Sequence, residues 1–526
     1  MEFLHPYSRY GLALVLEENG LETADEVNHE LLRKELIIGL NTFRIKPAES
    51  FEGVEQIKFN HMTYDFITSN KVFQSKGLPN EGIFLAPSIT SSDFQAGKTW
   101  LGINALIQKL NGQKDKRENL TMSVFPLSGK FNNGKKSQST PKALLTEVAC
   151  AAITTSTPYK PCLAYRIFKG GKTERNNTAI IPDLPLEKMI KFIALFKSMQ
   201  SDISKDLMVG KVFPKITGKG DKEKTTYTPW RPKIFNGNFP NPPQSSALGS
   251  LALLGAIGEW SKKANLWKEG QDILESLVDV PIYMVSYGNA KTFTYNHYVI
   301  ELAKESRLSR IIDAIYYTKL FNAENRSQSK NEYQGFDLFA SRFLQLFNRP
   351  ALKDFLAFRA EYPNELRILF ITYFIKMEKI NIEIVKSAKE LGRWLNYVAY
   401  LAARAEHSNT KGEDFKKAKA KILVEIESSA FSAKSGAALM AQVVTRAGRL
   451  AQNGIMNDKA AQTSAPAEAG IFMEAVCNEN PEVLSLDNAK NLLMAFSRLR
   501  NKYEKPDEVE EKTEVANKVD TSEYEE

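Results

Sequence analysis

Apolar residues recur at three- and four-residue steps through the C-terminal third of the chain. Such a stripe is one face of an amphipathic helix, with polar residues on the other side. The stripes lie in residues 382–402, 422–426, 439–450, 467–478 and 487–503. Short polar breaks separate them, and Asn480 with Pro481 marks the last break. We therefore expect a bundle of roughly five helices in residues 377–503.

The stripes also predict which side chains of this bundle are buried. The inward set is Ile382, Val385, Ala388, Leu391, Leu395, Val398, Ala402, Ile422, Leu423, Ile426, Leu439, Val443, Val444, Ala447, Leu450, Leu492, Leu493, Phe496 and Leu499. Basic residues lie off these stripes and are expected to point outward. They include Arg393, Arg404, Arg446, Arg449, Arg498 and Arg500. Each of them is also compatible with an ordinary solvated helix face.

The N-terminal part mixes both kinds of pattern. Alternating or β-rich runs predict strands at 54–60, 64–70 and 121–127, a hairpin turning at Gly170 and Gly171, and a strand, Gly-Asn turn and strand within 280–302. Helical periods predict helices at 24–40, 91–110, 143–155, 186–203 and 248–258.

The fold class is therefore α+β, with four successive segments. A mixed α/β body with basic loops spans 1–345, a helical connection spans 346–376, the all-α bundle spans 377–503, and an acidic tail expected to be disordered spans 504–526.

Charge points to an anionic partner. The whole chain has a net charge of +8. Ten acids and three lysines give residues 504–526 a net charge of −7, so residues 1–503 together carry +15. Nucleic acid is the commonest partner of a folded region this basic, but the same net charge is also compatible with a basic protein that has no such partner. Residues 377–503 hold 18 bases and 14 acids, so any binding there depends on how the charges are arranged.

Other classes find little support in the sequence. The three cysteines are far apart, which fits a reducing cytoplasm, and the five histidines are isolated, so neither a disulfide framework nor a zinc site is expected. No run of about 18 apolar residues predicts a membrane span. No catalytic motif, cofactor or metal site is expected.

One loop resembles a phosphate-binding motif. Gly129, Gly134 and Lys135 fit the G-x-x-x-x-G-K spacing, but Lys136 occupies the position of the metal-binding hydroxyl. A loop touching a nucleic-acid backbone and a plain solvated loop are the alternatives. Asn132 and Asn133 at its tip have the donors and acceptors to read base edges, with Lys135 and Lys136 on phosphates, but Asn-Asn is also ordinary turn chemistry.

A second basic segment runs from Lys205 to Lys233, with eight bases and three acids. It is expected to be a long loop, either functional or flexible and solvated. Aromatic residues interleave with its basic ones, a mixture that suits backbone contact and base stacking. The basic candidates are Lys215, Lys219, Lys222, Lys224 and Arg231.

A mixed body with lysine- and asparagine-bearing loops, followed by a small helical bundle, resembles the large subunit of type I CRISPR Cascade complexes, I-B-like, with a bundle similar to the small subunit fused to it. The resemblance covers the layout of the whole chain and no diagnostic motif. In some subtypes of this family the bundle is also made separately from an internal start, and Met377 stands where such a start would be useful.

The resemblance implies a non-catalytic subunit that recognises a short protospacer-adjacent motif in duplex DNA, helps unwind it and supports the R-loop. Its partners would be the guide crRNA, the target duplex and displaced strand, the backbone and handle-binding subunits, the small subunit, and a recruited helicase-nuclease or transposition adaptor. The alternatives are a nucleotide-binding enzyme using Gly129–Ser137 and a non-specific RNA-binding scaffold protein.

Overall fold

The protein is described here by a computed structural model in which two compact units are distinguished, Met1–Tyr316 with Asn325–Ala351 (the N-terminal unit) and Tyr317–Glu324 with Leu352–Glu526 (the C-terminal unit). The structure describes residues 5–41, 44–45, 50–51, 54–57, 65–67, 83–86, 93–112, 115–127, 141–157, 159–169, 172–202, 210–218, 220, 224–230, 246–309, 311, 361–362, 364–407, 410, 413–454 and 464–500. The predicted acidic tail lies outside them, and the predicted domain boundaries stay predictions.

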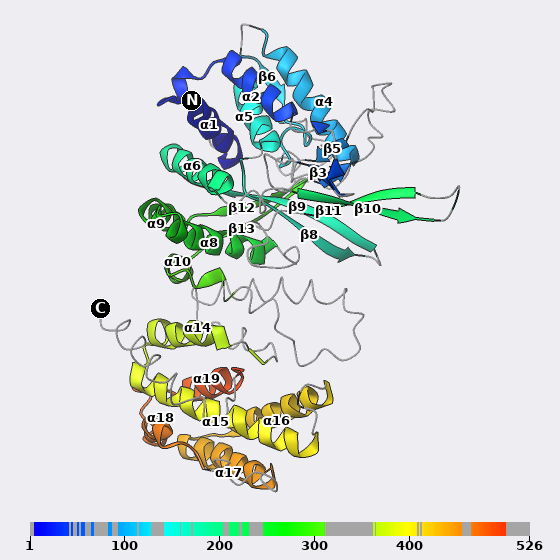
Figure 1. Ribbon diagram of the computed structural model, residues 1–526. Coiled ribbons are helices and arrows are strands. Elements are labelled where there is room, and N and C mark those ends of the chain that lie inside the picture. Colours follow the sequence, from blue (N-terminus) through cyan, green and yellow to red (C-terminus); the bar gives the residue numbers. More distant parts are fainter. Residues whose placement is uncertain are drawn as a thin grey trace. The chain divides into compact units, whose positions relative to one another are not determined.

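The N-terminal unit contains helices on both sides of a sheet (Figure 1). Its helices are α1 Pro6–Asn19, η1 Ala24–Glu26, α2 His29–Asn41, α4 Asp93–Lys109, α5 Leu145–Ser156, α6 Leu186–Asp202, α8 Ser246–Lys263, α9 Trp267–Ser276 and α10 His297–Lys304. Helices α5, α6 and α8 confirm the helices predicted at 143–155, 186–203 and 248–258.

Strands of this unit pair antiparallel wherever the described residues form a ladder. They are β1 Arg44–Ile45, β2 Ser50–Phe51, β3 Val54–Ile57, β4 Asp65–Ile67, β5 Ile83–Ala86, β6 Arg117–Asn119, β7 Lys142–Leu144, β8 Cys162–Lys169, β9 Lys172–Pro182, β10 Gly210–Thr217, β11 Lys224–Trp230, β12 Ile282–Ser286 and β13 Asn289–Phe293. The sheets run β1-β5-β4, β11-β10-β3-β2, β13-β12-β9-β8 and β6-β7.

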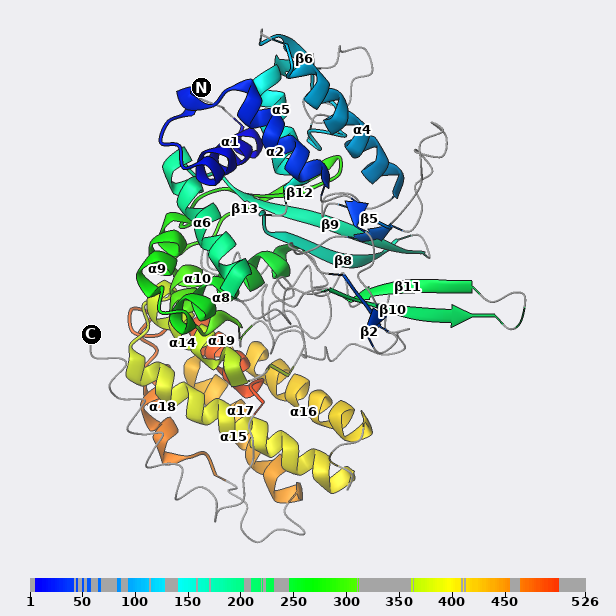
Figure 2. The ribbon, with the colours of Figure 1, turned by 45° about the horizontal axis from the view of Figure 1, so that its top comes forward.

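The sheet β13-β12-β9-β8 is the centre of the N-terminal unit. Helix α1 packs on β9 and α8 packs on β8, while α1 also contacts α5 and α6. Figure 2 shows the sheet between α1, α2 and α5 on one side and α8, α9 and α10 on the other. The core is therefore two helical layers against one sheet, and the α+β prediction is confirmed.

Several predicted strands are confirmed and others are corrected. The predicted hairpin is the β8–β9 pair, which closes at Lys169 and Lys172. Residues 121–127 form turns and not a strand, because the Val124 and Phe125 amides both bond back to the Thr121 carbonyl. In 280–302 the turn is one residue earlier than predicted, since Asn289 already pairs with Ser286.

The basic segment from Lys205 to Lys233 was expected to be a long loop, and this is wrong for its described residues. Strand β11 pairs with β10 along its whole length, from Lys211 with Trp230 to Thr217 with Lys224, and β10 also pairs with β3. The β-branched and aromatic residues favour this pairing. The segment is therefore a β-hairpin joined to a sheet.

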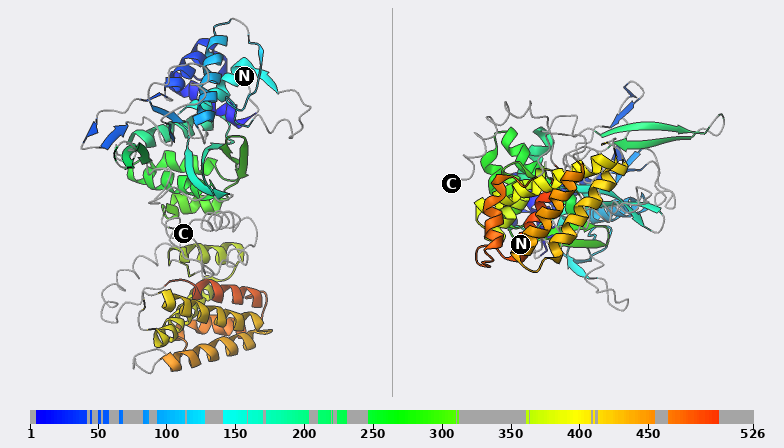
Figure 3. Two further views of the ribbon diagram at one scale, coloured as in Figure 1. Left: turned by 90° about the vertical axis from the view of Figure 1, so that its right-hand side faces the viewer. Right: turned by 90° about the horizontal axis from the view of Figure 1, so that it is seen from below.

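The C-terminal unit is helical throughout its described residues, apart from one isolated bridge. Its elements are η5 Asn364–Leu366, α14 Arg367–Thr372, the π-helical turn η6 Tyr373–Met377, α15 Ile382–Glu406, α16 Glu413–Ser432, α17 Gly436–Gly454, η8 Ala467–Ala469, α18 Gly470–Cys477 and α19 Leu486–Ser497. Helix α15 contacts α16, α17, α18 and α19. Figure 3 shows α19 and α17 on opposite sides of it.

The predicted apolar stripes largely match the buried side chains of this unit. On α15, Ile382 and Ala402 are only partly buried, and on α17 the same is true of Val444 and Leu450. The other residues of the predicted inward set are buried. The last helix ends at Ser497, earlier than predicted, because Tyr362 pairs with the chain beyond it: the Tyr362 amide bonds to the Arg498 carbonyl and the Arg500 amide to the Tyr362 carbonyl, both at 2.7 Å.

Residues before Met377 belong to the same packed core. The ring centroids of Phe370 and Phe374 lie 6.3 and 6.1 Å from that of Phe496 on α19. The Glu361 carboxylate accepts from the Lys419 ammonium of α16 at 2.6 Å. A product starting at Met377 would therefore lack side chains that cover α19 and neutralise a buried lysine.

Helix α1 begins with a titratable cap. The His5 Nδ1 accepts from the Tyr7 amide at 3.1 Å, and the ring lies edge-on to Phe125. Burial lowers the pKa of His5 from 6.5 to about 4, while the charge of Asp183 opposes this shift. A protonated Nδ1 cannot accept the capping bond, so the folded state favours neutral His5.

We predict that the N-terminal unit loses stability as the pH falls below 6.5 and that His5→Asn removes this part of the loss. The unfolded chain takes up the His5 proton first, which costs about 2 kcal/mol at pH 5. Asn keeps the cap without titrating. Urea unfolding at pH 7 and pH 5, followed by pulsed hydrogen exchange of α1 peptides, measures the effect. An unchanged pH dependence in His5→Asn would contradict the assignment.

We also predict that Gly392→Ala destabilises the C-terminal unit by about 1–3 kcal/mol. A Cβ at Gly392 of α15 would lie 2.5 Å from the Phe496 Cβ and 2.7 Å from its carbonyl carbon on α19. Gly470→Ala is the matched control, because its added Cβ meets no described residue within 4 Å outside its own stretch of helix. Thermal unfolding of the full chain compares the two. Equal melting temperatures would rule out the close approach of α15 and α19.

Candidate nucleic-acid interface

Helix α17 presents basic residues without any acid of its own. Leu439, Val443 and Ala447 face the core, where α17 contacts α15 and α16. This register turns Arg446 and Arg449 to the surface, as predicted. The start of the helix is fixed by Glu479, whose Oε1 accepts from the Gly436 amide at 2.8 Å.

A groove of about 590 Å³ runs between α16 and α17. Hydroxyl, amide and guanidinium groups line it, and its lining residues are Ser429, Ser432, Ala441, Gln442, Thr445, Arg446, Arg449 and Leu450. The Ser432 hydroxyl donates to the Gln442 Oε1 at 3.2 Å, which joins the two helices across the groove. Hydroxyls and guanidinium groups are the usual donors to phosphate oxygens.

The two arginines of the groove differ in their surroundings. The Arg446 guanidinium donates to Glu425 Oε2 at 2.8 Å and to the Ser429 hydroxyl at 3.3 Å, both on α16. Arg449 is exposed and makes no ion pair or hydrogen bond with any residue that the structure describes. An anion entering the groove therefore meets one arginine that is ready to bind and one that a carboxylate already holds.

Sequence reasoning identified the two arginines but missed the residues around them. Glu425, Ser429 and Ser432 lie three and four residues apart, which places them on one face of α16. Gln442 and Thr445 share a face of α17 with the arginines. The sequence signal that could have identified them is the set of small polar residues on the side of each helix opposite its apolar stripe.

The other predicted arginines of this unit are separated from the groove residues. Arg393 on α15 is exposed and lies 3.9 Å from Glu390, and Arg404 near the end of α15 is exposed as well. Arg500 follows α19 and lies 3.9 Å from Glu361. None of these three lines the groove.

The prediction that Arg498 points outward is wrong. Its side chain is only 2% exposed, and its Nε and a terminal nitrogen both donate to the carboxylate of Glu427, which is 9% exposed. Burial alone would lower the pKa of Arg498, but the hydrogen bond and charge of Glu427 raise it. The orientation differs because α19 ends at Ser497, so the helical period no longer sets where residue 498 points.

In the N-terminal unit, the predicted basic candidates are only partly described. Lys215 lies in β10 opposite Thr226, and Lys224 begins β11 opposite Thr217. Lys219, Lys222 and Arg231 lie outside the described residues, as does the Gly129–Ser137 loop with Asn132, Asn133, Lys135 and Lys136. Their predicted contacts with nucleic acid stay predictions.

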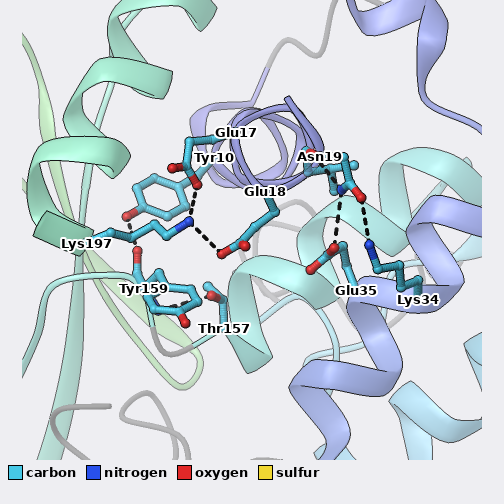
Figure 4. Close-up of polar contacts among 10 residues, drawn as sticks. Tyr10, Glu17, Glu18, Asn19, Lys34, Glu35, Thr157, Tyr159 and Lys197 are labelled. Carbon is cyan, nitrogen blue, oxygen red and sulfur yellow. Dashed lines mark hydrogen bonds and ion pairs between the residues drawn. The ribbon is translucent and has the colours of Figure 1, made fainter. Parts of the chain in front are cut away.

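A polar cluster on α1 and α6 contains charged side chains that bind one another within the N-terminal unit (Figure 4). The Lys197 ammonium binds Glu17 and lies 2.9 Å from Glu18, and it stands 5.1 Å from the centre of the Tyr159 ring. Burial alone would lower the pKa of Lys197, but hydrogen bonds to Glu17 and Glu18 raise it. The Tyr10 hydroxyl donates to the Tyr159 carbonyl at 2.7 Å. These contacts join α1, α6 and the segment before β8.

Neither a metal site nor a membrane-spanning helix is present in the described part of the chain. No group of three or more His, Cys, Asp or Glu residues is arranged there to hold a metal ion. No helix among the described residues is both long and apolar enough to cross a membrane.

Comparison with known proteins shows the family. The family model of CRISPR-associated protein Csp2 matches residues 5–500. Because the match spans nearly the whole chain, the protein belongs to the Csp2 family. The family supports the resemblance to a Cascade-type CRISPR subunit, implies assembly with crRNA and other Cascade subunits, and is consistent with a non-catalytic role. No curated protein matches the chain.

We predict that Arg498→Met costs stability without changing the nucleic-acid affinity of the folded protein. Removing one partner of a buried pair leaves Glu427 uncompensated, at a cost of about 3–5 kcal/mol. Arg500→Ala is the control, because that side chain is 54% exposed and its ion pair is worth at most about 1 kcal/mol. Denaturant unfolding and filter binding of folded protein measure the two effects. An Arg498→Met protein as stable as Arg500→Ala would refute the buried pair.

Proposed function

We propose that this Csp2-family protein is the non-catalytic large subunit of a Cascade-type complex, I-B-like, with a small-subunit-like helical bundle fused to its body. It recognises a short protospacer-adjacent motif in duplex DNA, helps to open the duplex and supports the R-loop. In this proposal the α16–α17 groove contacts the backbone of the displaced strand.

One observation carries the role of the groove. It combines two arginines with hydroxyl and amide donors, and one of the arginines, Arg449, is not engaged by any described residue. These groups bind phosphate oxygens of any sequence. A displaced strand has no fixed sequence, so backbone contact is the form of recognition that it requires.

Sequence reading belongs elsewhere in the proposal. The Asn132 and Asn133 tip, with Lys135 and Lys136, is the motif-reading candidate, because asparagine offers both a donor and an acceptor to base edges. The basic β10–β11 hairpin is the competing candidate, because a hairpin is narrow enough to enter a major groove. Guide pairing supplies the remaining specificity, as in other RNA-guided effectors.

We predict that the double variant Arg446→Ala/Arg449→Ala still assembles but holds DNA less tightly. The full chain is co-expressed with a guide RNA and the backbone subunits, and the purified complex is titrated with a target duplex carrying the motif. Loss of two phosphate contacts weakens binding about tenfold. For a single-stranded oligonucleotide, the slope of log K against log salt falls by roughly 1.4.

The matched control is Lys191→Ala/Lys386→Ala, which removes the same charge from two residues in exposed ion pairs away from the groove. If both double variants bind alike, the groove has no specific role. Recovery of the protein alone, without RNA, would overturn the proposal. Nucleotide binding by the isolated protein that weakens on Lys135→Ala would instead favour the enzyme alternative. RNA binding without any dependence on a guide or motif would favour the scaffold alternative.

A further inference from the structure

Glu425 is the carboxylate that pairs with one of the two groove arginines, Arg446. It lies on α16, is 38% exposed, and reaches across to Arg446 on α17, which is 44% exposed. Its Oε2 accepts from Arg446 at 2.8 Å. The Ser429 hydroxyl, which donates to the Glu425 carbonyl, accepts from the same guanidinium. Glu425 therefore occupies one of the two guanidinium groups that an incoming phosphate needs.

The strength of the Glu425–Arg446 ion pair decides whether a phosphate is able to replace Glu425. Glu427, two residues later, is buried and its partner Arg498 cannot be reached from solvent. The Glu425–Arg446 pair is open to water, and exposed pairs of this kind contribute only about 0–1 kcal/mol. A phosphate binds a guanidinium with charged hydrogen bonds of comparable or greater strength. A bound strand is thus able to displace Glu425 from Arg446, which it cannot do at Arg498.

We propose that Glu425 is a built-in competitor for nucleic-acid phosphate, which lowers the affinity of the groove by holding Arg446 until a strand displaces it. Arg449 is the permanent anchor, and Arg446 is recruited only when the strand is in place. This regulation rests on the proposed phosphate-binding function of the groove. It keeps the bundle from holding stray single strands tightly while it still supports a strand delivered by R-loop formation.

The alternative is that Glu425 only fastens α16 to α17. The helices already pack through buried residues such as Leu423, Ile426 and Val443, and the Ser432–Gln442 bond joins them next to the pair. Removing one exposed carboxylate therefore leaves the groove intact. A purely structural role predicts no gain in affinity when Glu425 loses its charge.

The test uses the full chain and a mixed-sequence single-stranded DNA of 20 nucleotides as probe. Affinity is measured by fluorescence anisotropy for the wild type, Glu425→Gln, Arg446→Ala, Glu425→Gln/Arg446→Ala and Arg449→Ala. Glu474→Gln, at an exposed position of α18, is the control for loss of one negative charge elsewhere. Thermal unfolding confirms that each variant is folded.

We expect Glu425→Gln to tighten binding about two- to fivefold beyond Glu474→Gln, a change of at most about 1 kcal/mol. The gain disappears when Arg446 is already alanine. Arg449→Ala weakens binding about three- to tenfold.

Two failures are distinguishable. If Arg449→Ala weakens binding but Glu425→Gln gives no gain, or the gain persists without Arg446, the competitor proposal is overturned and the groove function stands. If Arg446→Ala and Arg449→Ala both leave affinity unchanged, the groove function itself fails.

Discussion

The C-terminal unit depends on burying charges that must be paired. Arg498 and Glu427 form one buried pair, and buried Lys419 pairs with the partly buried Glu361 while it also donates to Asn396. An unpaired charge in these places would be strongly destabilising, so each pair fixes the register of the segments it joins. Asn396 completes the link by donating to the Ser497 carbonyl at the end of α19. Helices α15, α16 and α19 and the segment at Glu361 are thereby held in one arrangement.

This constraint also decides which positive charges remain for a partner. Lys419, Lys490 and Arg498 are buried and bind groups inside the unit. Lys490 caps the end of α16, because its ammonium donates to the Phe431 and Ala433 carbonyls. The modest net charge of the bundle is therefore not spread evenly over its surface. Helix α17 carries no acid, and the pairing of Arg446 with Glu425 makes Arg449 the more available of its two arginines.

Much of this fold could be predicted from the sequence because burial follows local periodicity. The stripes of α15, α16 and α17 gave the helices and most of their buried residues. Arg498 could not be placed in this way, because a distant residue, Tyr362, ends the helix one residue before it. The same limit applies to the β10–β11 hairpin, whose prolines and glycines suggested a loop although pairing with β3 completes a sheet. Of the groove, only the two arginines were predicted: they lie on α17, whereas Ser429, Ser432 and Glu425, the partner of Arg446, lie on α16.

Weak, sequence-independent contact is what the proposed role requires, because the guide RNA of such a complex reads the sequence. When guide pairing supplies specificity, tight binding of single strands by the protein would add affinity for every strand and discriminate among none. In the proposed role, two exposed arginines, one of them opposed by a carboxylate, would give the groove a modest affinity that falls with salt. Helix α17 is held against α15 and α16 by its buried Leu439, Val443 and Ala447, so its backbone is already in place before a strand arrives. The unit thus combines a strong buried ion pair, Arg498 with Glu427, and a weak exposed one, Arg446 with Glu425. The first stabilises the interior, and in the proposed role the second is the pair that a bound strand replaces.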